Sequence, residues 1–200
     1  MAALEASRTP VPHLHVVAIA AAGVVTGLLA PLPQAYATDR YLMQYLLAAI
    51  VSWLLGAAPF AVLAGAIARI AARCDPKRAA QFGVGTLVAF GIALLVCLAL
   101  GYLTRGTPEL IAGLVAGPAT GLAGSAAMAF AAGWLGVGPR TARQWWPMLG
   151  LGTALGALLG VDLIRESNYL FVLFPAWQAG VAAGLFLTMQ RWQQVRTGFS

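Results

Sequence analysis

The sequence predicts an all-α polytopic membrane protein, a bundle of about six transmembrane helices joined by short loops. Of its 200 residues, 60% are apolar and only 9% are charged, and the mean hydropathy is +0.82. A water-soluble domain normally carries about 25% charged residues. Because so few charges cannot cover a surface that faces water, we expect most of the outer surface to face hydrocarbon. The length fits one integral membrane domain, residues 1–200.

The charged residues divide the chain into long uncharged segments. Each segment is long enough to consider as a span, since a hydrocarbon core about 30 Å thick takes about 20 helical residues. We expect helices because backbone groups in hydrocarbon must pair within their own segment, and the segments lack the alternation of barrel strands. The predicted helices cover residues 15–32, 41–72, 79–103, 109–135, 146–164 and 168–192.

Prolines and charges set the ends of these helices. The first ends near Pro31, and the basic segment 69–78 separates the second from the third. Arg105 precedes the fourth helix, Arg143 the fifth and Arg165 the sixth. Each connection is short, so neighbouring helices should be antiparallel.

The first apolar segment has a second interpretation. Residues 16–29, followed by Pro31 and Ala35-Tyr36-Ala37, have the outline of a secretory signal with an A-x-A cleavage site. Residues 1–15 contain one Arg and one Glu, so they lack the positive excess of such a signal. We favour a retained first helix, and cleavage of residues 1–37 would leave five helices.

Basic residues predict the orientation. Nine of the 12 Lys and Arg residues lie in the amino terminus, the second and fourth loops and the carboxyl tail. Positive flanks stay on the cytoplasmic side, so both termini are expected in the cytoplasm of a cell with a bacterial-type inner membrane. The net charge of +6 is spread over short segments, which excludes a nucleic-acid-binding stripe. The predicted partner is the lipid bilayer, with other membrane subunits or a second copy as further alternatives.

A proline occurs in each of the three helices predicted to run inward: Pro59, Pro118 and Pro175. Proline lacks an N–H and crowds the carbonyl four residues earlier, so each helix should kink and free one carbonyl. The first two prolines share the pattern P-x-x-x-L-A-G, and the third matches it loosely. A hairpin unit repeated three times would explain this pattern, and so would chance in a chain rich in Ala, Gly and Leu.

The three kinked helices could surround a mid-membrane cavity, or the prolines could merely shape the bundle. The candidate lining combines the prolines with polar and aromatic side chains at similar depth. These residues are Pro59, Pro118, Pro175, Trp177, Gln178, Thr120, Ser125 and Ser52.

Glycines spaced four residues apart predict which helices pack closely, because small residues let two backbones approach. The fourth helix contains Gly113, Gly117 and Gly121, and the fifth contains Gly152, Gly156 and Gly160. We therefore expect these two helices to pack directly on each other. Gly23 with Gly27, and Gly180 with Gly184, are shorter examples in the first and last helices.

Few residues suit catalysis or metal binding inside a membrane, where ionisable groups mark function. The histidines, His13 and His15, lie at the edge of the first helix, and Cys74 and Cys97 lack metal or redox spacing. No catalytic residue, cofactor or metal is therefore expected. A candidate outer polar cluster comprises Asp162, Arg165, Glu166 and Asn168, with solvated loop charges as the alternative.

Three classes of function fit these observations. The first is a non-enzymatic accessory or binding subunit of a membrane complex. The second is a small-solute permease, or the substrate-binding subunit of a transporter, with a cavity between the kinked helices. The third is a lipid-modifying enzyme, for which the sequence offers no acid or base at depth.

Overall fold

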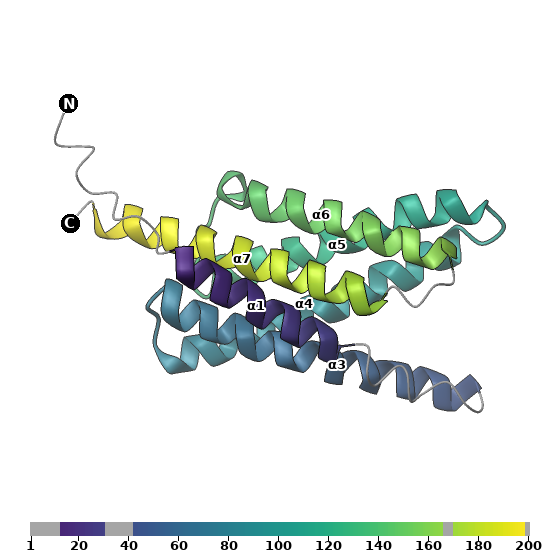
Figure 1. Cartoon of the computed structure of the whole chain (residues 1–200), viewed down its shortest axis with the longest axis horizontal. Coiled ribbons are helices and arrows are strands. Elements are labelled where there is room, and N and C mark those ends of the chain that lie inside the picture. Colours follow the sequence, from purple (N-terminus) through teal and green to yellow (C-terminus); the bar gives the residue numbers. More distant parts are fainter. Residues whose placement is uncertain (1–12, 31–41, 166–169, 199–200) are drawn as a thin grey trace.

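The computed structural model describes residues 13–30, 42–165 and 170–198 (Figure 1). These residues form six helices and no strand, which confirms the predicted all-α class for this part of the chain. The helices are α1 (His13–Leu29), α3 (Leu42–Ala71), α4 (Pro76–Leu103), α5 (Glu109–Trp134), α6 (Ala142–Arg165) and α7 (Leu170–Thr197).

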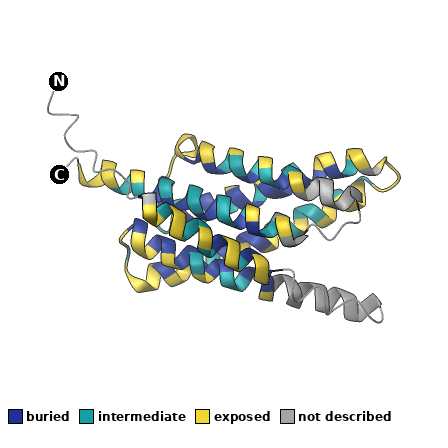
Figure 2. Ribbon diagram, in the orientation of Figure 1, coloured by how far each residue is buried: buried dark blue, intermediate teal, exposed yellow. Residues whose placement is uncertain are grey.

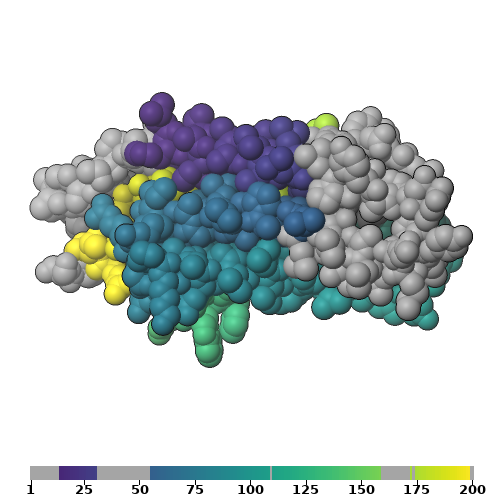
Figure 3. Space-filling view, turned by 90° about the horizontal axis from the view of Figure 1, so that it is seen from below, coloured from purple at the N-terminus to yellow at the C-terminus, as the bar shows by residue number. Residues whose placement is uncertain are grey.

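The helices contact one another in chain order from α3 to α7, and α1 closes the ring by packing against both α7 and α3. The contact between α5 and α6 is the most extensive, followed by that between α1 and α7. Figure 3 shows α1 lying beside the described part of α3. Helix α7 also contacts α3 and α6, so this last helix joins the first helices of the bundle to the later ones.

Local sequence explains how α4 begins and how α5 ends. Asp75 caps α4 by accepting a hydrogen bond from the backbone N–H of Arg78, and Pro76 occupies the first turn, where its missing N–H costs nothing. Gly136 adopts a φ of +67° after α5. The N–H groups of Gly136 and Val137 donate to the carbonyls of Gly133 and Ala132, which is a Schellman motif.

Three helix ends extend at least three residues beyond the predicted limits. The cap at Asp75 starts α4 at Pro76 instead of residue 79. Helix α6 starts at Ala142 instead of residue 146, and it continues through Pro147. Helix α7 continues through its polar end to Thr197 instead of residue 192. Charges had marked the ends of apolar segments, and the helical hydrogen bonds continue past them.

Many large apolar residues are exposed, among them Val62, Leu95 and Phe130. Figure 2 marks the exposed residues along the helices. The buried core is rich in alanine, with Phe60, Phe82, Met128 and Met148 among its large side chains. Among the described residues, α4 and the Leu110–Trp134 part of α5 are long and apolar enough to cross a membrane. Their most apolar windows have hydropathies of 2.5 and 1.5.

Candidate functional site

Three aromatic rings from three helices meet in the interior. Trp177 of α7 lies 6.0 Å from Phe60 of α3 and 5.3 Å from Phe90 of α4, measured between ring centroids, and the two Phe rings are 5.8 Å apart. Both contacts of Phe90 are edge to face, a favourable arrangement of aromatic rings. The sequence singled out Trp177, and the only signal for Phe60 was its position directly after Pro59.

Gln178 is the most unusual side chain of the interior. It follows Trp177 on α7, it is fully buried, and neither its amide nitrogen nor its amide oxygen has a hydrogen-bond partner among the described residues. An unpaired buried polar group costs about 1–3 kcal/mol. A group that the fold retains at this cost is a candidate for contact with a ligand or an ordered water.

Two hydroxyl groups of α5 share this property. The Oγ1 of Thr120 and the Oγ of Ser125 are buried, and neither has a hydrogen-bond partner among the described residues. Ser125 faces α6, since a Cβ placed on Gly152 would overlap its Oγ. The structure therefore places Ser125 at the α5–α6 interface and Trp177 beside α3 and α4.

The predicted prolines lie inside helices that continue through them: Pro59 in α3, Pro118 in α5 and Pro175 in α7. Pro175 is buried against α1, whereas Pro59 and Pro118 are half-buried. The side chains four residues before the latter two, Leu55 and Leu114, are exposed. A cavity shared by all three prolines stays a prediction.

Several predicted residues lie wholly or partly outside the described part of the chain. Glu166 and Asn168 of the outer cluster are not described at all. Ser52, Gly160, Asp162 and Arg165 lie in described helical backbone, but their side chains and surroundings are not described. The remaining glycines of the two predicted GxxxG patterns lie in the described part of the chain. A Cβ on Gly156 would lie 2.5 Å from the Gly117 carbonyl oxygen, and one on Gly121 would lie 3.0 Å from the Gly156 Cα. Gly113 is also buried.

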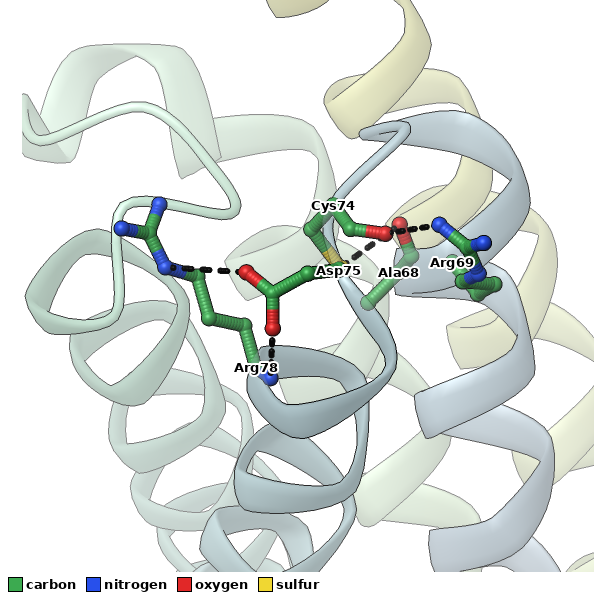
Figure 4. Close-up of polar contacts among 5 residues, drawn as sticks. All are labelled: Ala68, Arg69, Cys74, Asp75 and Arg78. Carbon is green, nitrogen blue, oxygen red and sulfur yellow. Dashed lines mark hydrogen bonds and ion pairs between the residues drawn. The ribbon is translucent and has the colours of Figure 1, made fainter.

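A polar corner joins α3 to α4 (Figure 4). The Arg69 guanidinium donates to the Cys74 carbonyl, and the Cys74 thiol donates to the Ala68 carbonyl at 3.4 Å. The Asp75 carboxylate accepts from the Arg78 N–H at 2.9 Å and pairs with the Arg78 Nε at 3.4 Å. These bonds fix the corner.

The same contacts change two pKa values. The pKa of Asp75 is lowered, chiefly because its carboxylate accepts the hydrogen bond from the Arg78 backbone. The pKa of the Cys74 thiol is raised, mainly by burial and further by the negative charge of Asp75. The thiol is therefore held protonated, which makes it a poor nucleophile.

A polar cleft of about 510 Å³ lies next to this corner. We call the end of the bundle that contains it the basic end. The α3–α4 corner, the α5–α6 loop and the end of α7 all lie there (Figure 1). The cleft is lined by Ala72, Arg73, Cys74, Asp75, Arg78, Gly136, Gln193, Arg196 and Thr197. Sequence reasoning treated these arginines only as markers of orientation.

The described residues thus define an all-α protein with an apolar outer surface, a buried amide at its centre and a basic cleft at one end. No protein-family model matches the chain, and neither does any curated protein or solved structure. Function must therefore be argued from these sites.

Proposed function

We propose that this chain is a polytopic integral membrane protein. The main observation is that the two described helices long and apolar enough to cross a membrane face outward: only 22% of the apolar window of α4 and 39% of that of α5 is buried. A core helix of a soluble protein would bury most of such a window. Every helix also exposes a large apolar residue, as Leu14, Val62, Leu95, Leu114, Leu158 and Val172 illustrate.

Six spans with both termini in the cytoplasm fit the distribution of charge and aromatic residues. Arg69, Arg78, Arg140 and Arg196 belong to segments at the basic end (Figure 1). Exposed Trp134 ends α5 close to the α5–α6 loop. Tryptophans at such positions suit a membrane interface. This supports a bacterial-type inner membrane with the basic end inside.

The two cysteines provide a test of this orientation. Cys74 lies in the α3–α4 corner and Cys97 within α4. The raised pKa of Cys74 slows its alkylation, so the reagent is applied until labelling is complete. A membrane-impermeant maleimide should then label Cys74 in inside-out vesicles and should fail to label it in intact cells. Cys97 should stay unlabelled in both, with Cys74→Ser and Cys97→Ser as matched controls. Equal labelling of Cys74 in intact cells would overturn the proposed topology.

Within the membrane, a non-enzymatic accessory or binding subunit is the function that we favour. Small residues such as Gly85, Ala89, Ala123 and Ala127 line an apolar cleft of about 830 Å³ along α4 and α5. Small residues permit close approach between helices in lipid. This outward cleft supports an accessory role because a neighbouring subunit could pack there.

Solute handling is the second candidate, and the amide of Gln178 favours it. A polar solute held between helices needs donors and acceptors that the protein leaves free, and this amide has both. Trp177, the preceding residue of α7, packs with Phe60 and Phe90 in a separate aromatic cluster of the interior.

Purification of the full chain in mild detergent, followed by native mass spectrometry, separates the two functions. A stoichiometric partner protein supports the accessory subunit. A bound small molecule that Gln178→Met abolishes supports solute handling. Neither a partner nor a bound molecule, from a protein that fractionates with membranes, would contradict both functions and leave the membrane proposal standing.

A further inference from the structure

We propose that the cleft at the basic end is an anion site that binds a phosphate group, either as free phosphate or as the headgroup of an anionic lipid. The site goes beyond the proposed function, because it needs neither the interior amide nor a partner subunit. Only its lipid source depends on the membrane placement.

The cleft is built from three segments that are far apart in the sequence. Residues 72–75 and Arg78 form one wall, Gly136 of the α5–α6 loop contributes another, and the last turns of α7 close it. Figure 3 shows the end of α7 emerging beside the α3–α4 corner. A volume of about 510 Å³ lies within the range of small-ligand sites.

The lining carries an excess of positive charge. Arg73, Arg78 and Arg196 contribute three guanidinium groups, against the single carboxylate of Asp75. That carboxylate is already engaged by the N–H and the Nε of Arg78. Two positive charges are therefore left for an anion. Arginine suits phosphate because its planar fork of N–H donors matches the phosphate oxygens.

Two further features of the cleft suit it to binding a ligand. The Arg196 guanidinium lies over the Trp192 ring, 5.5 Å from the centroid, which limits the freedom of a long side chain. The Oε1 of Gln193 is buried without a hydrogen-bond partner among the described residues. Rotation of this amide brings its NH₂ to the same position, where it can donate to a phosphate oxygen.

The chemistry of the cleft favours binding over reaction. Its only thiol, Cys74, donates to the Ala68 carbonyl and is held protonated. A protonated thiol attacks poorly. The arginines can hold an anion but supply no base, and the Asp75 carboxylate is a weak base because its pKa is lowered and it is paired with Arg78. The site should therefore bind a phosphate group without changing it.

The experiment uses the full-length protein and two probes. Inorganic phosphate is titrated calorimetrically into protein in neutral detergent. Separately, lipids retained from nanodiscs of equimolar phosphatidylcholine and phosphatidylglycerol are counted by native mass spectrometry. Arg73→Asn and Arg196→Gln each remove one charge, and asparagine suits the positive φ of 49° at Arg73. Lys77→Gln is the matched control, because Lys77 lies in the same segment outside the lining.

Each arginine variant should bind the effective probe at least about tenfold more weakly, since a charge-assisted hydrogen bond is lost. Lys77→Gln should bind as the wild type does. Saturable binding of inorganic phosphate identifies a free-phosphate site, and retention of phosphatidylglycerol alone identifies a lipid headgroup. The proposal is overturned if neither probe binds, or if Lys77→Gln weakens binding as much as the arginine variants do.

Discussion

Gly27 of α1 lies directly against Pro175 of α7. A Cβ at Gly27 would lie 2.5 Å from the Pro175 nitrogen and closer still to its Cα. Four residues earlier, a Cβ at Gly23 would lie 2.6 Å from the Cα of Ala179. The GxxxG pattern of α1 therefore packs on the helix segment that contains both the proline and Gln178, so α1 holds the first turns of α7 in place.

Gly27→Ala should destabilise the protein by about 1–3 kcal/mol, because the added methyl group overlaps backbone that cannot move alone. Gly91→Ala is the control, since a Cβ at this α4 position meets nothing within 4 Å. It should leave stability unchanged or raise it slightly, given the better helix propensity of alanine. Unfolding by SDS in mixed micelles measures both. Equal effects of the two substitutions would show that α1 does not pack on α7.

The α5–α6 interface provides a second test and control pair of glycine substitutions, both in α6. Gly156→Ala should lower stability by about 1–3 kcal/mol, because its methyl group would approach the Gly117 carbonyl and the Gly121 backbone. Gly150→Ala places a methyl group in open space on the same helix and should be tolerated. Thermal unfolding in detergent, followed by circular dichroism, compares the two. A neutral Gly156→Ala would contradict the close approach of α5 and α6.

The sequence indicated that the chain forms several long helices, because charged residues separate one apolar segment from the next. The charges did not mark where the helical backbone begins or ends, since α4, α6 and α7 all extend through charged residues. Glycine spacing also indicated that α5 and α6 approach closely, as Gly121 and Gly156 do. The same pattern at Gly23 and Gly27 could not name α7 as its partner. A helix face of small residues indicates that another helix packs closely on it, but only the tertiary structure shows which helix that is.

The interior and the basic cleft were harder to predict for the same reason. Phe60, Phe90 and Trp177 come from three helices, and their contact depends on how each helix is rotated about its axis. Arg73 and Arg196 are more than a hundred residues apart. Counting basic residues predicts the side of the membrane, but it cannot show that two of them line one cleft.

Asp75 should make stability depend on acidic pH. Its folded-state pKa is lowered below the usual 3.8. Its contribution is therefore complete above the unfolded-state pKa and is lost as the pH falls through the folded-state value. Asp75→Asn keeps a good capping residue but removes the charge.

Melting temperatures should be measured for both proteins from about pH 6 to about pH 2. The wild type should melt at a higher temperature near neutral pH, and this advantage should shrink as the carboxylate is protonated. An advantage that stays constant down to the lowest pH would show that the charge of Asp75 does not stabilise the corner.

Substitution of Gln178 tests whether its buried amide stabilises the fold or serves to bind a solute. Gln178→Met has similar volume and removes the unpartnered amide, so it should raise stability in detergent by about 1–3 kcal/mol. Gln194→Met, at an exposed position of the same helix, is the matched control and should change stability little. Chemical unfolding of the ligand-free protein measures both. A destabilised Gln178→Met would mean that the amide already has hydrogen-bond partners in the folded protein. The amide would then give no support to a solute-binding site. If the variant is more stable and also loses a co-purifying molecule, the fold sacrifices stability at this position for binding.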